Sequence, residues 1–356
     1  MAVPQLLWRA LLVFEKSVEF VLRRYLGPEE LEGLILTSLG NGRINDTYLV
    51  ENIREPWVLQ RINAEVFAEP AVVAMNFIAI SRHLNARVDK KYQWPRHIPS
   101  LTGDPFVHDR SGDVWRCQTY IPSSSLLPSR QSISAMGAAL AAFHRALVSM
   151  DRELIQDPLP GFHNLPLYLE EYGSQPPSRE EASLRCAQQL ERFRVPALLF
   201  AKALEKEALP CQFIHGDPKL DNFLFDHEGR VLSLIDLDTV YWASPLVDIA
   251  DALRSLQSPA GGWAMAVDLH SCQMFLQGYL ALKVDILAGR EKSYLFDALL
   301  AISYELAVRF FTDHLAGDRY FKVEEHGDNL RRAEEQFALV EDIFLKELSL
   351  RTLFQS

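Results

Sequence analysis

The stretch His215-Gly-Asp-Pro-Lys-Leu-Asp-Asn222, with the run Leu232-Ser-Leu-Ile-Asp236 that follows it, decides the fold of this chain. Within it, Asp217 lies two residues after a histidine, and Asn222 lies five residues after Asp217. Turn-forming residues between the two runs separate short β-prone segments, which predicts a β-hairpin. Such a hairpin lets Asn222 and Asp236 reach one cleft.

These residue types match the needs of phosphoryl transfer. That reaction uses a carboxylate to orient the acceptor hydroxyl and oxygen ligands to hold Mg²⁺ against nucleotide phosphates. The pattern H-x-D-x-x-x-x-N is the spacing of the kinase catalytic loop. We therefore expect Asp217 to be the catalytic base, and Asn222 and Asp236 to bind Mg²⁺. Each element alone also fits an ordinary turn or cap, so the prediction depends on their combination.

The segments on either side of this stretch differ in character. Short β-prone runs from Leu34 to Gln118 predict a small antiparallel sheet, with one helix over Pro70–Asn85. The run Ile121–Ser129 is rich in Pro and Ser and predicts a linker. Beyond it, amphipathic helices dominate. The predicted class is α+β, with an N-terminal amphipathic helix over 1–30, a nucleotide-binding lobe over 31–120, a hinge over 121–130 and a mainly helical lobe over 131–356.

Composition excludes several classes of partner. The 356 residues carry a formal charge of −11 and have a pI of about 5.4, so neither nucleic acid nor a membrane surface is an expected partner. Four cysteines without CxxC spacing argue against a zinc site or a disulfide framework. Charged residues interrupt the apolar N-terminal stretch, leaving no signal peptide or membrane span. The expected location is cytoplasmic, and the oligomeric state stays open.

Four segments carry a resemblance to a known family. They are Gly40-Asn-Gly-Arg-Ile-Asn-Asp-Thr-Tyr48, Val58-Leu-Gln-Arg-Ile-Asn63, His215-Gly-Asp-Pro-Lys219 and Arg309-Phe-Phe-Thr-Asp-His314. With them the chain resembles the aminoglycoside phosphotransferase and choline kinase superfamily, of bilobal protein-kinase-like fold, from about Leu34 to about Leu345. It is most similar to N-acetylhexosamine 1-kinases. The resemblance implies transfer of the ATP γ-phosphate, with Mg²⁺, to the anomeric hydroxyl of N-acetylglucosamine or N-acetylgalactosamine.

The resemblance also assigns roles around the catalytic loop. Asp217 matches the family's base, while Asn222 and Asp236 match its metal ligands. Lys219 lies where a cation would stabilise charge on the transferring phosphoryl group, although a solvated loop lysine is the alternative. His215 is expected to organise the loop, and Asp248 to brace it. His144 is expected to be a core histidine with a backbone partner.

On the nucleotide side the sequence departs from the kinase pattern, since it has no G-x-G-x-x-G. Gly40, Asn41 and Gly42 join two expected strands as a phosphate-covering loop would, or form a simple Asn-Gly turn. Arg61 is the expected phosphate-binding cation, with Gln60 as the rival position because neighbours on a strand face opposite ways. Glu65 and Glu69 are candidate partners of Arg61. Backbone groups at Gln118 and Tyr120 occupy the hinge position that holds adenine.

The acceptor sugar is expected to meet polar residues of the helical lobe. Candidate ligands are Asp217, Arg309, Asp313 and Tyr320 in this lobe, and Asn45 in the nucleotide-binding lobe. Arg309 and Asp313 share one helix face, so a surface ion pair is the alternative. Trp263 is a candidate platform for a sugar face, with a core position as its alternative.

Other functions stay open at this point. A choline acceptor would need an aromatic cage, and an aminoglycoside an acidic rim, for which Glu324 and Glu325 are candidates. Homoserine is a third possible acceptor, and a pseudokinase a further class. The joint presence of Asp217, Asn222 and Asp236 argues against an inactive protein.

Overall fold

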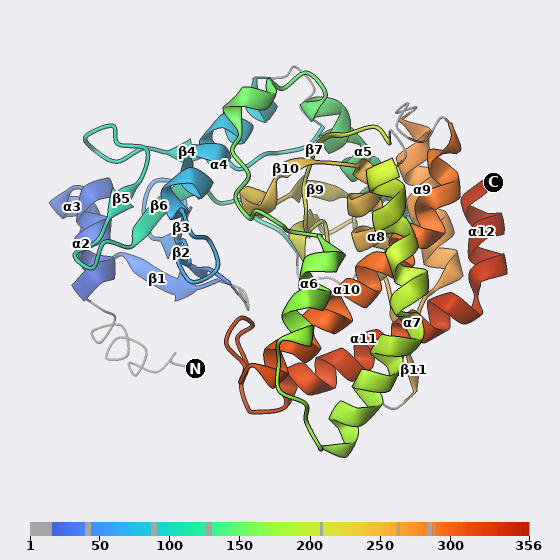
Figure 1. The fold of residues 1–356 in the computed structure, drawn as a ribbon. Helices are drawn as coiled ribbons and strands as arrows, with labels where there is room; N and C mark the ends of the chain where they lie inside the picture. Colours follow the sequence, from blue (N-terminus) through green and yellow to red (C-terminus); the bar gives the residue numbers. More distant parts are fainter. Residues whose placement is uncertain are drawn as a thin grey trace, which may run out of the picture. The chain divides into compact units, whose positions relative to one another are not determined.

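The first part of the chain builds one antiparallel sheet in the computed structural model, which describes residues 16–39, 44–86, 91–124, 130–206, 209–261, 264–282, 287 and 289–355 (Figure 1). The strands run in the order β1-β2-β3-β6-β4, and β5 also pairs with β6. Their bounds are β1 Ile35–Ser38, β2 Asp46–Glu51, β3 Trp57–Arg61, β4 His97–Ile98, β5 Val107–His108 and β6 Val114–Thr119. The predicted antiparallel sheet is thus confirmed, and β4 is a two-residue strand that periodicity did not reveal.

Helices cover this sheet on both faces. Helix α4, Pro70–Asn85, has the bounds that its apolar periodicity predicted. On the opposite face, apolar side chains of α2 (Lys16–Tyr25) pack into one cluster with Leu59 and Trp115. The short helix α3 spans Pro28–Leu31. The expectation that an N-terminal amphipathic helix docks on the protein is therefore confirmed for residues 16–25, while 1–15 lie outside the described residues.

The rest of the chain is mainly helical. The long helices are α5 Arg130–Leu147, α6 Leu165–Gly173, α7 Glu181–Lys206, α8 Pro245–Ser255, α9 Leu269–Ala281, α10 Leu295–Leu315, α11 Asp328–Leu345 and α12 Glu347–Gln355. Helix α10 is buried along most of its length and packs against α7, α8 and α11. Helices α5 and α9 come so close that a Cβ on Gly278 would lie 1.8 Å from the Ser134 carbonyl oxygen. A glycine is needed at that crossing.

Three small ladders interrupt these helices. They pair β7 Gln212–Ile214 with β10 Tyr241–Ala243, β8 Phe223–Phe225 with β9 Val231–Leu234, and β11 Ser258–Gly261 with β12 Ala264–Ala266. Short 3₁₀ turns lie at Arg152–Leu154 (η1), Leu220–Asn222 (η2), Leu237–Thr239 (η3) and Arg290–Tyr294 (η5). The predicted β8–β9 hairpin is confirmed, whereas β10, β11 and β12 are additions.

The chain divides into two compact units. Unit 1 comprises Met1–Arg87 and Gln93–Pro122, and unit 2 comprises Val88–Tyr92 and Ser123–Ser356. The sheet belongs to unit 1, and the long helices from α5 onwards belong to unit 2. In the part of the chain that is described, no helix combines the length and apolarity that crossing a membrane requires.

Candidate active site

The stretch His215–Asn222 follows β7 and begins with a tight turn at Gly216. Strand β7 ends at Ile214, and Gly216 adopts a positive φ of 87°. A Cβ at Gly216 would lie 2.4 Å from the carbonyl oxygen of Thr239. Both the dihedral angle and the close approach therefore require glycine here.

The buried carboxylate of Asp248 anchors this loop. Asp248, in the first turn of α8, accepts hydrogen bonds from the backbone N–H groups of His215 at 2.6 Å and Gly216 at 2.8 Å. His144 Nε2 lies 2.8 Å from the same carboxylate. Burial alone would raise the pKa of Asp248, but the hydrogen bond from His144 and the other donors outweigh it, and the pKa is lowered. Asp248 therefore braces the loop as a carboxylate.

The two histidines of this network have distinct partners. His144 bonds Asp248 through Nε2 and the hydroxyl of Tyr279 through Nδ1, at 2.8 Å each. The expected backbone partner is therefore wrong, because a carboxylate and a phenol fill that place. His215 Nε2 donates to the carbonyl of Ile235 at 2.9 Å, and its Nδ1 accepts from the N–H of Asp217 at 3.3 Å. Burial lowers the pKa of His215, which keeps the ring neutral and suits the structural role predicted for it.

The candidate base lies between a cation and an amide. Lys219 Nζ forms an ion pair with Asp217 Oδ2. Asn222 Nδ2 donates to the Asp217 carbonyl at 2.7 Å, with a second, longer contact of 3.4 Å to Oδ2. Burial would lower the pKa of Lys219, but Asp217, Asp236 and Asp251 outweigh it, and the pKa is raised. Lys219 therefore carries its charge among three carboxylates.

The hairpin brings Asp236 to this group. Strands β8 and β9 pair Phe223 with Leu234, and the N–H of Ile235 donates to the Asn222 carbonyl at 2.9 Å. Asp236 follows directly in the left-handed region, at φ 66°. Such a conformation in a non-glycine residue costs roughly 1–3 kcal/mol, and strain of this kind gathers at functional sites.

One site residue, His163, was not anticipated. Its Nε2 lies 2.8 Å from the carbonyl oxygen of Gly216, and its Nδ1 lies 3.0 Å from Glu305 Oε1 on α10. Both side chains are nearly buried, at 7% and 3% exposure. Because both ring nitrogens face acceptors, each needs a hydrogen, so the geometry favours an imidazolium. Burial would lower the pKa of His163, but Glu305, Asp251 and the Gly216 carbonyl outweigh it, and the pKa is raised.

Arg309 lies one helical turn after Glu305, inside a ring of aromatic side chains. Its guanidinium carbon is 5.0–5.5 Å from four ring centroids, those of Phe162, Tyr168, Tyr320 and Phe321. We call these four residues the aromatic box. Burial would lower the pKa of Arg309, but the two phenols, Glu305 and Asp217 outweigh it, and the pKa is raised. Arg309 is thus a charged group near the candidate base.

The neighbouring Asp313 has a different task. Its carboxylate accepts from the N–H groups of residues 319, 320 and 321 at 2.8–2.9 Å, and from Asn329 Nδ2 at 2.9 Å. These four donors use the acceptor capacity of one carboxylate. The expectation that Asp313 binds the acceptor is therefore corrected: it anchors the loop after α10. Arg309 instead donates to the hydroxyl of Tyr320, at 3.3 Å.

In unit 1, the two rival positions on β3 face opposite ways. Arg61 lies on the face that α2 covers, and it forms ion pairs with Asp46 and, at 3.1 Å, with Asp113. These partners replace Glu65 and Glu69, so that expectation was wrong. Gln60 lies on the other face.

The Gln60 face carries a second arginine. Arg116 Nη2 donates to Gln60 Oε1 at 2.8 Å, and the guanidinium of Arg116 lies 4.4 Å from the ring centroid of Phe77 on α4. Arg116 is almost completely buried. The sheet face on the α4 side therefore pairs the amide of Gln60 in β3 with a buried cation of β6.

The remaining unit 1 candidates have roles in the sheet. Asn45 Oδ1 accepts from the N–H of Asn63 at 3.0 Å. Gln118 lies in β6 between β3 and β4, and the N–H of Tyr120 donates to the Pro56 carbonyl at 3.3 Å. Gly40, Asn41 and Gly42, together with Trp263 of unit 2, lie outside the described residues.

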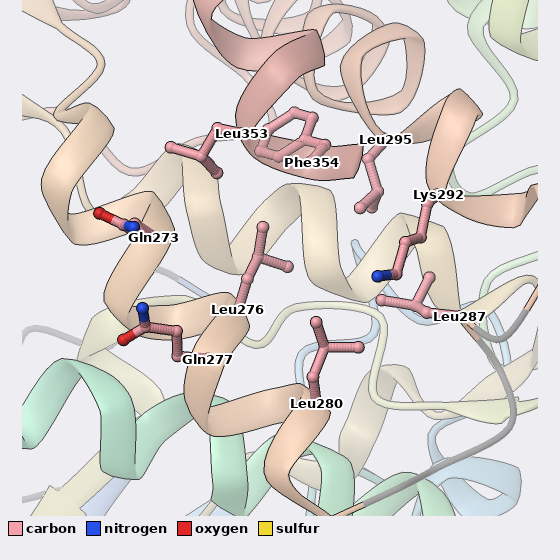
Figure 2. Close-up of a pocket in the computed structure, with 9 residues that line it drawn as sticks. All are labelled: Gln273, Leu276, Gln277, Leu280, Leu287, Lys292, Leu295, Leu353 and Phe354. Atoms are coloured by element: carbon pink, nitrogen blue, oxygen red, sulfur yellow. The ribbon is translucent and has the colours of Figure 1, made fainter. Parts of the chain in front are cut away.

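A pocket of about 140 Å³ lies elsewhere in unit 2, among α9, η5, α10 and α12 (Figure 2). Leu276, Leu280 and Leu295 point into it, and Lys292 stands at its side. None of the candidate site residues lines it. The described residues that line it include no carboxylate that could be a base or a metal ligand.

A sequence profile described as "Phosphotransferase enzyme family" matches residues 35–283, which is more than half of the chain. The chain belongs to this family. It is therefore a phosphotransferase, which confirms the coarse prediction made from the catalytic-loop pattern. The matched region contains Asp217, Asn222 and Asp236.

Solved structures of similar fold include several small-molecule phosphotransferases. An aminoglycoside phosphotransferase from Alicyclobacillus acidocaldarius has 18% identity and a TM-score of 0.61, covering 100% of this chain and 97% of its own. A microcompartment-associated aminopropanol kinase has 16% identity and a TM-score of 0.67, covering 94% and 98%. Choline kinase from Cryptosporidium parvum has 12% identity and a TM-score of 0.62, covering 96% and 100%. At these identities the likeness establishes the fold, which confirms the predicted kinase-like α+β class.

Proposed function

We propose that this phosphotransferase moves the γ-phosphate of ATP to a hydroxyl of an uncharged sugar, with Mg²⁺ bound. The expected acceptor is an N-acetylhexosamine, phosphorylated at its anomeric hydroxyl. One observation carries the choice of acceptor: the aromatic box already contains the guanidinium of Arg309. Choline and other cationic alcohols would need ring faces of that kind for their own charge.

The positive charge of Arg309 also favours an uncharged acceptor. A cationic acceptor near Arg309 would be repelled by the positive guanidinium, which the surrounding phenols and carboxylates keep protonated. An uncharged sugar meets no such repulsion. Arginine has five N–H donors, and in the described part of the chain one of them bonds Tyr320. The others suit hydroxyl and acetamide oxygens, so the site favours an acceptor rich in oxygen.

The chain's own residues supply the chemistry beside Arg309. Asp217 is proposed to accept the hydroxyl proton, and Lys219, paired with it, to offset negative charge on the transferring group. Asn222 donates through its amide nitrogen, so its Oδ1 would be the ligand atom, together with the carboxylate of Asp236. Oxygen ligands are those that Mg²⁺ prefers, so these residues fit the ion. When bound, Mg²⁺ supplies positive charge that neutralises phosphate oxygens.

In unit 1 we propose that nucleotide contacts come from Gly40, Asn41 and Gly42, and from backbone groups at Gln118 and Tyr120. In kinases the phosphate-binding side chain of this strand pairs with the following helix. Gln60 of β3 and Arg116 of β6 lie on the sheet face where Arg116 contacts that helix, α4, whereas Arg61 is held by two carboxylates on the other face. Gln60 is therefore the better candidate than Arg61.

A coupled ADP-release assay with Mg-ATP tests the proposal on a matched pair of acceptors. N-acetylglucosamine and glucosamine share one ring but differ in an acetamide against an amine, which is protonated below its pKa. We expect turnover of the acetamide sugar and at least ~10-fold lower kcat/KM for the charged one, the scale of one lost or repulsive polar contact. Choline and an aminoglycoside complete the panel.

Variants of one loop give the control. Asp217→Asn is expected to lose at least ~10³-fold, since it removes a positioned base. Asp221→Asn changes an exposed carboxylate four residues away and is expected to keep wild-type activity. Turnover restricted to cationic alcohols would overturn the sugar assignment. Absence of all turnover with nucleotide still bound would instead favour a pseudokinase.

A further inference from the structure

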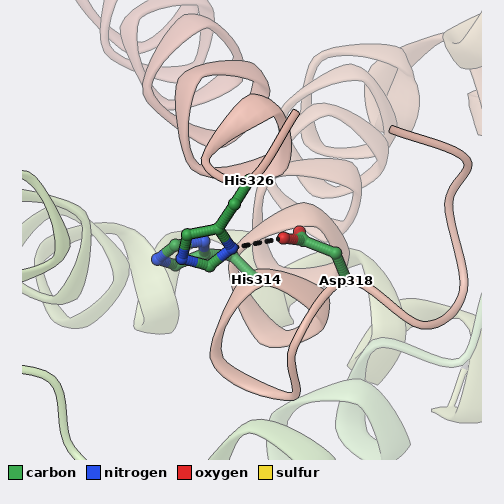
Figure 3. A group of neighbouring side chains, drawn as sticks. All are labelled: His314, Asp318 and His326. Atoms are coloured by element: carbon green, nitrogen blue, oxygen red, sulfur yellow. Dashed lines mark hydrogen bonds and ion pairs between the residues drawn. The ribbon is translucent and has the colours of Figure 1, made fainter. Parts of the chain in front are cut away.

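A second group of ligand-type side chains lies where α10 ends and its following loop closes. His314 is near the end of α10, while Asp318 and His326 come from the loop that leads to α11. One ligand atom of each residue lies within 4.8 Å of the other two. Figure 3 shows the two imidazole rings overlapping, with the Asp318 carboxylate beside them.

The surroundings of His314 leave one of its ring nitrogens available as a ligand atom. Its side chain is 6% exposed, and its Nε2 lies 3.5 Å from Glu180 Oε2. A hydrogen on Nε2 faces that carboxylate, which leaves the lone pair on Nδ1. Within the described residues, this buried Nδ1 has no hydrogen-bond partner. An unsatisfied buried polar atom destabilises the folded protein, so a ligand at this position would relieve that cost.

Asp318 is oriented in a similar way. Its backbone is in the left-handed region at φ 57°, and Asn329 Nδ2 donates to its Oδ1 at 2.9 Å. The other oxygen, Oδ2, lies 2.8 Å from Nδ1 of His326. Asn329 thus orients the carboxylate of Asp318, as second-sphere partners of metal ligands do, and the hydrogen bond to His326 lies within the group itself.

We propose that His314, Asp318 and His326 bind a divalent transition-metal ion such as Zn²⁺. Two imidazoles and one carboxylate suit this class of ion and not Mg²⁺, which prefers oxygen alone. Ligands about 2.0–2.2 Å from Zn²⁺ lie at most roughly 4 Å apart, so the group must contract slightly. His326, whose side chain is 78% exposed, is free to turn inward.

The loop that the ion would close also carries Tyr320. Asp313 anchors residues 319–321 to the end of α10, and the hydroxyl of Tyr320 contacts Arg309. The metal would join the two ends of this loop. Metal binding itself goes beyond the proposed sugar kinase activity and does not depend on it.

Competition with a chromophoric chelator measures the site on the full chain. Protein stripped of metal is titrated with Zn²⁺ in excess Mg²⁺, which keeps oxygen-only sites filled, and Co²⁺ serves as a spectroscopic probe. We expect about one equivalent of Zn²⁺ and visible Co²⁺ bands typical of nitrogen ligation. His326→Ala should weaken binding at least ~10-fold, because outer-sphere changes alone cost about 10–100-fold.

Control variants distinguish a specific metal site from adventitious binding of Zn²⁺ to surface side chains. His270→Ala removes another exposed histidine of unit 2 and should bind as the wild type does. Asp318→Asn should weaken binding as His326→Ala does, with circular dichroism confirming that both variants fold. Equal affinity in wild type and His326→Ala, or no Zn²⁺ binding at all, would overturn the proposal. Loss of sugar turnover would leave the binding result standing, so the two proposals fail separately.

Discussion

The buried His163–Glu305 pair allows a quantitative test of how the catalytic loop is held. His163 joins Glu305 to the carbonyl of Gly216, and both side chains are nearly buried. His163→Gln removes the cation and leaves the Glu305 carboxylate uncompensated, which costs about 3–5 kcal/mol of unfolding free energy for a buried pair. Glu305→Gln lets His163 lose its proton instead, so its cost should be smaller.

The double variant isolates the interaction between the two side chains. With both replaced by glutamine no buried charge remains, so its cost should fall short of the sum of the single costs. Coupling between residues in direct contact is typically about 0.5–3 kcal/mol, and we expect the upper part of that range. Urea unfolding followed by circular dichroism gives the four free energies.

The sign of the pH dependence follows from the direction of the pKa. Folding raises the pKa of His163 above its ordinary value of about 6.5, with Glu305, Asp251 and the Gly216 carbonyl facing the ring and Tyr241 stacked on it. The stabilisation is therefore complete below that ordinary value and is lost as pH rises through the raised pKa of the folded state. The coupling energy should be large at about pH 6 and small at high pH. A coupling energy that is near zero, or that does not change with pH, would refute the imidazolium.

Three further variants probe the same loop and the acceptor site. Asp248→Asn replaces one of the two carboxylate oxygens that accept from His144 and from the N–H groups of His215 and Gly216. We expect it to lower the free energy of unfolding in urea by roughly 2–5 kcal/mol. A change under about 0.5 kcal/mol would contradict the bracing role. Gly216→Ala meets a carbonyl at 2.4 Å, whereas Gly317→Ala has the same positive φ but open space, so the first should cost at least ~2 kcal/mol more than the second. Arg309→Met keeps the bulk and removes the charge, so kcat/KM for the sugar should fall about 10–100-fold, and unchanged kinetics would exclude Arg309 from acceptor binding.

The sequence predicted what depends on short-range pattern. Helix α4 was found with its bounds because its apolar residues recur with the helical period. The proximity of Asp217, Asn222 and Asp236 was predictable because their spacing lies within one loop and one hairpin. The two-residue strand β4 was missed because it is too short to show alternation.

Long-range partners could not be predicted in this way. His163 and Glu305 are 142 residues apart, and neither belongs to a local motif that suggests the other. Alternation on β3 showed that Gln60 and Arg61 face opposite ways, but only the packing of α2 shows which face each one occupies. Asp313 looked like a ligand because it is polar and close to Arg309, yet backbone N–H groups of its own loop use its oxygens.

Phosphorus NMR of the reaction product shows directly which hydroxyl receives the phosphoryl group. Wild-type protein is incubated with Mg-ATP and N-acetylglucosamine, with Asp217→Asn as the matched inactive variant. We expect a sugar phosphate whose phosphorus couples to the anomeric proton, formed together with ADP and absent with the variant. A spectrum showing phosphorylated choline or aminoglycoside in parallel reactions, and no sugar phosphate, would contradict it.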